Sequence, residues 1–187
     1  MHDSGDNSPS LSAVEPSPDE PEPPGRLSIN IVEEAGDWSA LEAPETAIRA
    51  AAAALASHPQ FDRAPGSEAC VVLGDDNLLR TLNREYRGKD APTNVLSFPF
   101  DDPRQLGDIV LAVETLRREA DAQGIAPVHH LQHLVVHGLL HLSGFDHETD
   151  AEAEVMEGLE VEILASLGIP DPYAPADGPI DRPSEER

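Results

Sequence analysis

Histidine is concentrated in one short part of this chain of 187 residues. Six of the eight histidines lie between residues 129 and 147. His137 and His141 stand four residues apart, which places both imidazoles on one face of a helix, one turn apart. His147 follows Gly144, a residue type that commonly ends helices, and a turn there returns the third imidazole to the same point. The spacing of His137, His141 and His147 therefore predicts a metal site.

The ligand set of three imidazoles indicates which metal to expect. Neutral imidazoles suit zinc, and three protein ligands leave a fourth position for water or substrate, as in catalytic sites. We therefore expect one Zn²⁺ per chain, although imidazoles also suit nickel, copper and iron. The other histidines of the cluster are expected to pack or to support the ligands, namely His129, His130 and His133. Two acids flank His147, Asp146 and Glu148, and each is expected either to orient an imidazole or to cap the next helix.

The same spacing is found in metzincin proteases, with one difference at the residue after the first histidine. Those proteases carry a glutamate there as general base, and this chain has Gly138, which cannot accept a proton. A metallopeptidase thus remains an alternative, in which the base comes from Asp146, Glu148 or a metal-activated water. A glycine on this helix also predicts a close approach to a neighbouring element.

The elements that must position these residues predict an α+β fold. Alternating and apolar patterns predict four strands, and caps with helical periodicity predict about five helices. The expected strands are Leu27–Val32, Glu68–Leu73, Asn94–Phe98 and Gly107–Val113. The expected helices are Pro44–Ser57, Asp75–Gly88, residues 114–124, Pro127–Leu142 and Thr149–Gly168. We expect a small mixed four-stranded sheet packed with these helices, with the metal site at the end of a central histidine-rich helix.

Composition and charge set the domain organisation. The formal net charge is −24, and residues 1–25 and 171–187 are acidic and rich in proline, so both are expected to be disordered tails around a folded domain over 26–170. No apolar run is long enough for a membrane span, and the first residues do not resemble a secretory signal. The single cysteine, Cys70, excludes an internal disulfide and fits the reducing cytoplasm. Strong acidity argues against non-specific binding to nucleic acid, although residues 78–100 form a local basic island.

Three blocks of the sequence resemble the signatures of the YbeY endoribonucleases, also called ribosomal RNA maturation factors. They are residues 82–98, 106–110 and 137–147, in the order that the family has them. The resemblance extends from about Leu27 to Ile169 and leaves both acidic tails outside. The family often has tyrosine where this chain has Phe145, a change that touches no expected ligand.

The resemblance implies an activity, a substrate and a catalytic arginine. It implies a metal-dependent endoribonuclease that acts on single-stranded RNA, in 16S rRNA 3′-end maturation and ribosome quality control in the bacterial cytoplasm. The implied partners are the small ribosomal subunit and a ribosomal protein or an assembly GTPase. It also implies that Arg87 lies near the metal, where a guanidinium can hold phosphoryl oxygens in paired hydrogen bonds. We expect Arg84 and Lys89 to contact RNA, and a non-catalytic module for ribosome assembly remains a further alternative.

Overall fold

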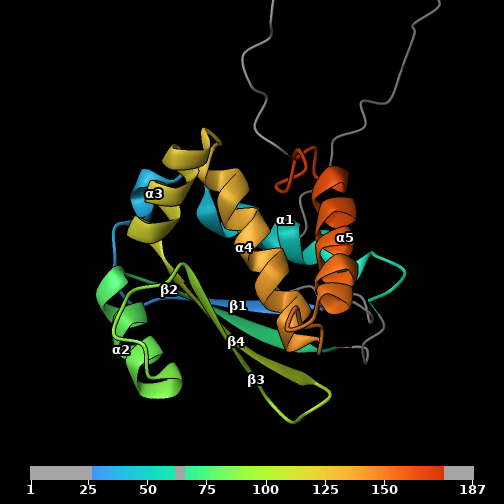
Figure 1. The fold of residues 1–187 in the computed structure, drawn as a ribbon, viewed down its shortest axis with the longest axis horizontal. Coiled ribbons are helices and arrows are strands. Elements are labelled where there is room, and N and C mark those ends of the chain that lie inside the picture. Colours follow the sequence, from blue (N-terminus) through green and yellow to red (C-terminus); the bar gives the residue numbers. More distant parts are fainter. Residues whose placement is uncertain (1–26, 62–65, 175–187) are drawn as a thin grey trace, which may run out of the picture.

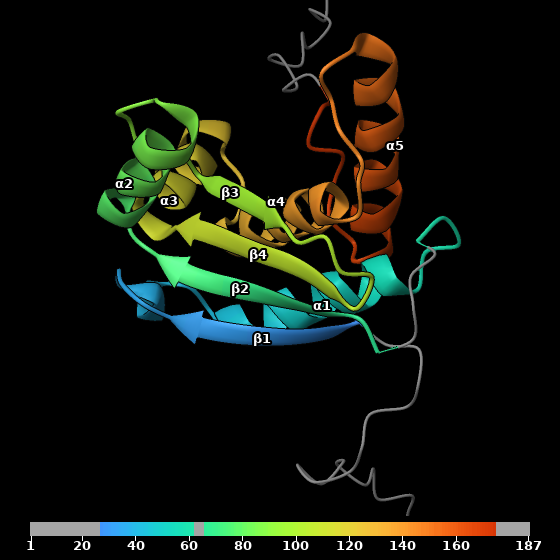
Figure 2. The ribbon, with the colours of Figure 1, turned by 90° about the horizontal axis from the view of Figure 1, so that it is seen from below.

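A four-stranded mixed sheet forms the centre of the computed structural model, which describes residues 27–61 and 66–174. The strands are β1 (Ser28–Glu33), β2 (Glu68–Gly74), β3 (Val95–Pro99) and β4 (Gln105–Ala112). They lie in the order β1-β2-β4-β3, so that β3 is an edge strand (Figure 2). β1, β2 and β4 are parallel, and β3 is antiparallel to β4. The expected α+β fold with a small mixed sheet is therefore confirmed.

Five α-helices connect and cover these strands in the part of the chain that the structure describes (Figure 1). They are α1 (Pro44–Ala56), α2 (Asp76–Arg87), α3 (Val113–Gln123), α4 (Pro127–Leu142) and α5 (Asp150–Ser166). The predicted capping signals operate at their ends: Asp75 accepts the Leu78 N–H, and Thr149 and Glu152 form a capping box. A short 3-10 helix at Trp38–Ala40 was not expected from the sequence.

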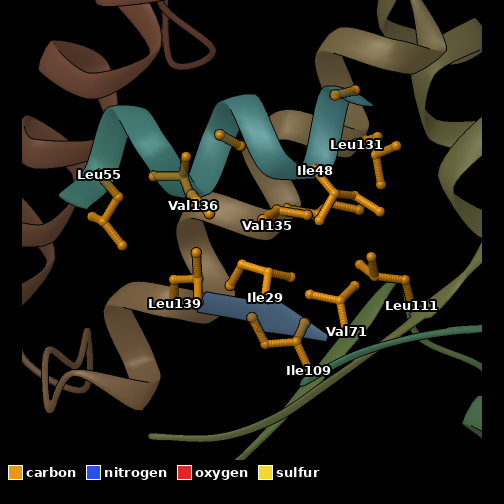
Figure 3. Close-up of a cluster of buried hydrophobic side chains, with 14 of the residues drawn as sticks. Ile29, Ile48, Leu55, Val71, Ile109, Leu111, Leu131, Val135, Val136 and Leu139 are labelled. Carbon is orange, nitrogen blue, oxygen red and sulfur yellow. The ribbon is translucent and has the colours of Figure 1, made fainter. Parts of the chain in front are cut away.

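The main hydrophobic core lies between one face of the sheet and α1, α4 and α5. Strand residues point toward the helices, and α4 crosses the middle of the layer (Figure 3). The fully buried side chains drawn there include Val71, Ile109 and Leu111 from the sheet and Ile48, Leu55, Leu131, Val135, Val136 and Leu139 from α1 and α4. A smaller cluster on the opposite face packs α2 against β3 and β4 through Leu79, Leu96, Val110 and Ala112. The helix that carries the histidines, α4, and the helix that ends at Arg87, α2, are therefore each fixed against a face of the same sheet.

Gly138 on α4 allows the close approach that the sequence predicted. A Cβ at this position would lie 2.9 Å from Ile109 Cδ1 and 3.0 Å from each of the two Cγ atoms of that residue. Since Ile109 is fully buried on β4, α4 can lie this close to the sheet only because residue 138 has no side chain. This contact fixes the height of the histidine-bearing end of α4 above the sheet.

The observed bounds differ from the expected ones mainly at β4. This strand begins at Gln105 rather than Gly107, and Val113 belongs to α3 rather than to the strand. The helix begins there because the Asp76 carboxylate accepts hydrogen bonds from the backbone N–H and the hydroxyl of Thr115, which satisfies part of the first turn. None of the helices in the described ranges has the length and apolar character that a membrane crossing requires.

The expected tails fall largely outside the described residues. Residues 1–25 lie wholly outside them, and of the expected tail over 171–187 only residues 171–174 are described. Those four residues follow α5 and include Tyr173, whose side chain is hydrogen-bonded to the folded domain. The ordered contacts of the domain thus extend past the expected boundary at residue 170.

Candidate metal centre

The end of α4 and the turn that follows it bring three imidazoles together. His137 and His141 lie one turn apart on α4, which ends at Leu142. Gly144 then adopts a φ of 91°, and the Phe145 N–H donates to the Leu140 carbonyl, so that the chain reverses. This reversal brings His147 back, and one nitrogen from each of the three histidines lies within 4.8 Å of the others. The three residues that the sequence singled out thus form one cluster.

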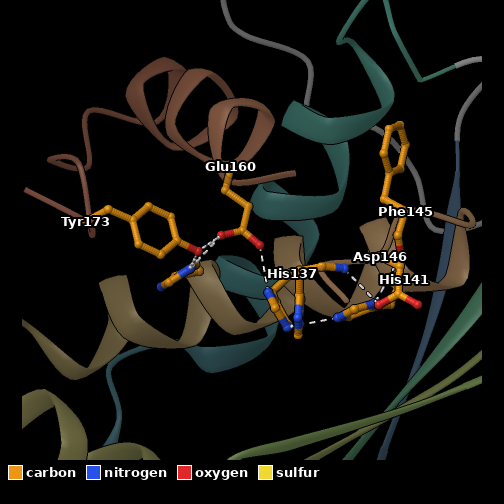
Figure 4. A network of polar contacts seen from close by, with 8 residues as sticks. His137, His141, Phe145, Asp146, Glu160 and Tyr173 are labelled. Atoms are coloured by element: carbon orange, nitrogen blue, oxygen red, sulfur yellow. Dashed lines mark hydrogen bonds and ion pairs between the residues drawn. The ribbon is translucent and has the colours of Figure 1, made fainter. Parts of the chain in front are cut away.

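The rings of His137 and His141 are held by their Nδ1 atoms (Figure 4). Nδ1 of His137 lies 2.7 Å from Oε1 of Glu160, and Nδ1 of His141 lies 3.1 Å from the carbonyl oxygen of Phe145. A carboxylate and a carbonyl oxygen can only accept hydrogen bonds, so Nδ1 carries the proton in both rings. The Nε2 atoms therefore present lone pairs, and they lie 3.1 Å apart.

This arrangement fits a bound metal ion. Two lone pairs at this separation repel each other, and a cation between them converts that repulsion into two ligand bonds. The fixed Nδ1 partner of each ring is the usual support of a metal-ligating histidine. Burial, with His137 and His147 adding to it, lowers the pKa of His141 and favours its neutral form. The donor set of three imidazoles suits zinc and leaves room for a further ligand.

Glu160 on α5 holds His137 of this cluster and was not among the expected site residues. Its side chain is buried, and besides His137 it accepts hydrogen bonds from His133, at 3.0 Å, and from the hydroxyl of Tyr173. Burial alone would raise the pKa of Glu160, but these hydrogen bonds lower it to about 2. Glu160 is therefore an anion that faces His137 within the protein interior.

A sequence signal for Glu160 did exist. Met156, Leu159 and Ile163 mark the apolar face of α5, and residue 160 falls on that face by helical spacing. An acid on the buried face of a helix requires partners, so its position indicated a polar network. The partners themselves come from α4 and from beyond α5, which no local pattern reveals.

A hollow of about 630 Å³ opens over the three histidines, between the end of α4 and β3. Arg87, the expected catalytic residue, lines the same hollow from the end of α2. Thr93, Asn94 and Ser97 add polar groups to its wall, and these three residues were not among the expected site residues. Arg84 and Lys89 are not among the lining residues, and Nη1 of Arg84 lies 4.0 Å from Oδ1 of Asp90. The structure therefore brings Arg87 to the site and leaves the two expected RNA contacts outside the hollow.

Asp146 and Glu148 line the hollow without taking either of their expected roles. The cap of α5 is Thr149, so neither acid caps that helix. Asp146 accepts a hydrogen bond from the backbone N–H of His147 at 2.8 Å. Within the described residues, no hydrogen bond joins Asp146 or Glu148 to an imidazole, and the Nδ1 atoms of His137 and His141 contact Glu160 and the Phe145 carbonyl instead.

His130 and His133 support the site rather than joining the cluster, whereas His129 does not line the hollow. His133 shares Glu160 with His137, as expected from its place one turn earlier. His130 lies buried beside Glu119, with Nε2 at 2.8 Å from Oε2, and burial lowers its pKa. The same Glu119 oxygen accepts a hydrogen bond from Asn94 in the wall of the hollow, at 2.8 Å. Glu119, itself held by His130, thus fixes the side chain of Asn94 in the wall of the hollow.

The fold and the site together define an α+β protein with a three-histidine cluster beneath an open, arginine-lined hollow. A sequence model described as endoribonuclease YbeY matches residues 33–168. The chain is 55% identical over 161 residues to an endoribonuclease YbeY from Azorhizobium caulinodans, a match that covers 81% of this chain and 100% of the relative. It is 52% identical over 149 residues to one from Rhodopseudomonas palustris, covering 75% and 86%.

A solved structure agrees with these matches. The solution structure of TM1509 from Thermotoga maritima is similar with a TM-score of 0.50 and 25% identity, over 79% of this chain and 99% of that one. The chain belongs to the endoribonuclease YbeY family. The resemblance found in the sequence is therefore confirmed.

Proposed function

We propose that this chain is a metal-dependent endoribonuclease that cleaves single-stranded RNA. The observation that carries this proposal is the convergence of His137, His141, His147 and Arg87 on one open hollow, in a chain of the endoribonuclease YbeY family. The expected metal is one Zn²⁺ per chain, held by the Nε2 atoms of His137 and His141 together with His147. Such an ion supplies Lewis acidity, which polarises a phosphoryl oxygen or activates water.

The protein's own residues position and stabilise the reacting phosphate. Cleavage of RNA places negative charge on the phosphoryl oxygens, and the guanidinium of Arg87 can hold two of them through parallel hydrogen bonds. Asn94, which Glu119 holds in place, and Ser97 offer further hydrogen bonds to the phosphate or the sugar. Glu160 keeps Nδ1 of His137 protonated, so that its Nε2 stays free to act as a ligand.

The substrate and cellular setting follow from the family resemblance. We expect the substrate to be the 3′ end of 16S rRNA on the small ribosomal subunit, in the cytoplasm, with a ribosomal protein or an assembly GTPase as a further partner. We also expect Arg84 and Lys89 to contact the RNA outside the hollow, and residues 1–25 together with the end of the chain to act as acidic tails.

The two alternatives explain fewer of the observations. The contact between Gly138 and Ile109 leaves no room for the usual metzincin glutamate, so a metallopeptidase would take its base from Asp146 or Glu148, which line the hollow. That function would give Arg87 no role. A purely structural module for ribosome assembly would not require Arg87 to lie beside the histidine cluster. The family match also favours the endoribonuclease.

Single-turnover cleavage of a labelled single-stranded RNA that spans the 16S 3′ end tests the proposal. The wild-type chain should cut this RNA, and His137→Ala should bind less metal and lose cleavage. His129→Ala is the matched control, because His129 lies on the same helix outside the hollow. Metal content is measured by elemental analysis of the same preparations. Equal cleavage by wild type and His137→Ala would mean a contaminating nuclease and would overturn the proposal.

A further inference from the structure

An exposed aromatic pair lies beside the hollow and takes no part in the function proposed so far. Tyr86 on α2 is 68% exposed, although it is one of the largest side chains of the protein. Its ring meets that of Phe98 on β3 edge to face, with the ring centres 5.0 Å apart and an angle of 66° between the planes. We call Tyr86 and Phe98 the aromatic platform. Phe98 contacts the Tyr86 ring, and the exposure of Tyr86 leaves most of its ring accessible to a ligand.

The aromatic platform and the hollow lie on opposite sides of one edge strand. Successive residues of a strand point to opposite faces, and Val95, Ser97 and Pro99 of β3 line the hollow. Leu96 and Phe98 point the other way and pack toward α2. No further strand pairs with the outer side of β3 in the described sheet (Figure 2). A flexible chain can therefore pass from the hollow around this edge to Tyr86.

Two residues that follow Tyr86 in the sequence, Arg87 and Lys89, supply positive charge. Arg87 directly follows Tyr86 and lines the hollow. Arg80 is held by two hydrogen bonds to Asp90, of 2.8 and 3.0 Å, and this ion pair neutralises it. Arg87 and Lys89, by contrast, form no ion pair with any described residue. A phosphate backbone thus finds free cations next to the aromatic platform, on a chain that is otherwise strongly acidic.

We propose that the aromatic platform stacks one unpaired base of the RNA whose phosphate lies in the hollow. This inference rests on the proposed function and adds to it a base-binding site at Tyr86. Every base offers a flat π face, so stacking on an aromatic side chain binds single strands without reading their sequence. A base inside a duplex is already stacked on its neighbours and cannot reach Tyr86. The aromatic platform therefore favours single-stranded over double-stranded substrate.

The test compares Tyr86→Leu with Tyr86→Phe in the full-length, metal-loaded chain. Leucine keeps an apolar contact with Phe98 and lacks a π face, whereas phenylalanine keeps the face and loses only the hydroxyl. Single-turnover cleavage of a short single-stranded RNA gives the half-saturating protein concentration and the maximal rate. Tyr86→Leu should raise that concentration by roughly 5- to 150-fold, the range for removal of one stacking aromatic. Its maximal rate should stay near wild type, and Tyr86→Phe should match wild type in both.

A base analogue and an aromatic control make the result specific. A 2-aminopurine in the RNA should lose fluorescence on binding to wild type and retain it with Tyr86→Leu. Phe100→Leu is the control, because Phe100 is 48% exposed and lines a different hollow, on the open face of β1, β2 and β4. If Tyr86→Leu has the half-saturating concentration of wild type and quenches 2-aminopurine equally, the aromatic platform does not bind a base. Cleavage by wild type in the same assay would still support the nuclease function. Failure of wild type itself to bind or cleave the RNA would overturn the nuclease and the aromatic platform together.

Discussion

Glu160 joins three side chains from two other parts of the chain at a single buried carboxylate. It accepts hydrogen bonds from His133 and His137 of α4 and from Tyr173, which follows α5. A buried anion with three donors is strongly fixed, because removal of one donor leaves charge without compensation. Glu160 thus sets the ring orientation of His137 through charge as well as through hydrogen-bond geometry.

The substitution Glu160→Gln tests this role. Glutamine has the size of glutamate and can still accept from His137, but it has no charge with which to favour the ligating form of the ring. Metal affinity should fall about 10- to 100-fold, the usual effect of changing such an outer partner, as measured by competition with a chromophoric chelator. The control is Glu154→Gln on the exposed part of the same helix. Equal metal affinity in the two variants would contradict the role of Glu160.

Arg87 is tested by a substitution that keeps its charge. Arg87→Lys removes the planar fork, which a single ammonium group cannot replace at a phosphate. Cleavage in single-turnover assays should fall on the order of 100-fold if Arg87 stabilises the transition state, whereas half-saturation and metal content should remain near wild type. Arg117→Lys on the exposed side of α3 is the matched control. Weakened binding at an unchanged maximal rate would instead show that Arg87 only holds the substrate.

At the residue scale, the sequence predicts site residues that lie close together along the chain. His137, His141 and His147 could be singled out because one helical turn and one glycine place them together. Arg87 came from the family resemblance, since about fifty residues separate it from His137. Glu160 and Asn94 could not be predicted as site residues, because their partners lie on other elements. Only the packing of α4 against α5 and β3 brings Glu160 and Asn94 to the site.

At the scale of elements, the contact between α4 and β4 sets how the histidines stand above the sheet. Gly138→Ala would gain about 1 kcal/mol in helix propensity. It would also force a methyl group against three atoms of the buried Ile109, and such overpacking costs about 1–3 kcal/mol. We expect a net loss of stability in denaturant unfolding, with partial recovery in the double variant Gly138→Ala with Ile109→Val.

Gly158 on α5 is the matched control for this prediction. Within 4 Å of a Cβ built at Gly158 there is no atom in the described structure outside its own helix backbone and its chain neighbours. Gly158→Ala should therefore raise the free energy of unfolding by about 0.5–1 kcal/mol. If both alanine variants gained stability alike, the close approach of α4 to the sheet would not be a constraint.

The sequence predicts the elements well and their arrangement less well. Caps and glycines act locally, so the ends of α2 and α5 are close to the predicted ones. The strand order β1-β2-β4-β3 depends on which strands pair, and pairing is decided by contacts between distant residues. That order places β3 at the edge next to α4, where residues of β3 form one wall of the hollow.

At the scale of the whole molecule, its acidity restricts where RNA can bind. A net charge of −24 repels a phosphate backbone from most of the surface. Arg87, at the end of α2, lines the hollow, so at least one positive charge that attracts a phosphate backbone lies at the site itself. Binding there depends on positive charge, so the affinity for RNA should fall as the salt concentration rises.

The boundary of the folded domain is also a property of the whole molecule. Near the end of the described residues, the hydroxyl of Tyr173 donates a hydrogen bond to the buried Glu160. Composition alone placed the boundary of the folded domain at residue 170. If that boundary held, a chain ending at residue 170 would melt like the full chain. The hydrogen bond of Tyr173 argues against this, because a bond to a charged acceptor contributes about 1.5–3 kcal/mol.

A chain ending at residue 174 should therefore keep the thermal midpoint of the full chain, and one ending at residue 170 should melt several degrees lower. Tyr173→Phe in the full chain separates the hydroxyl from the rest of the segment. It retains the ring beside His133 and removes only the donor to Glu160, so it should account for a large part of the loss. Calorimetry of the four proteins decides the matter. Equal midpoints for the full chain and the chain ending at residue 170 would mean that the folded domain ends at residue 170, as composition predicts. Glu160 would then be stabilised by His133 and His137 alone.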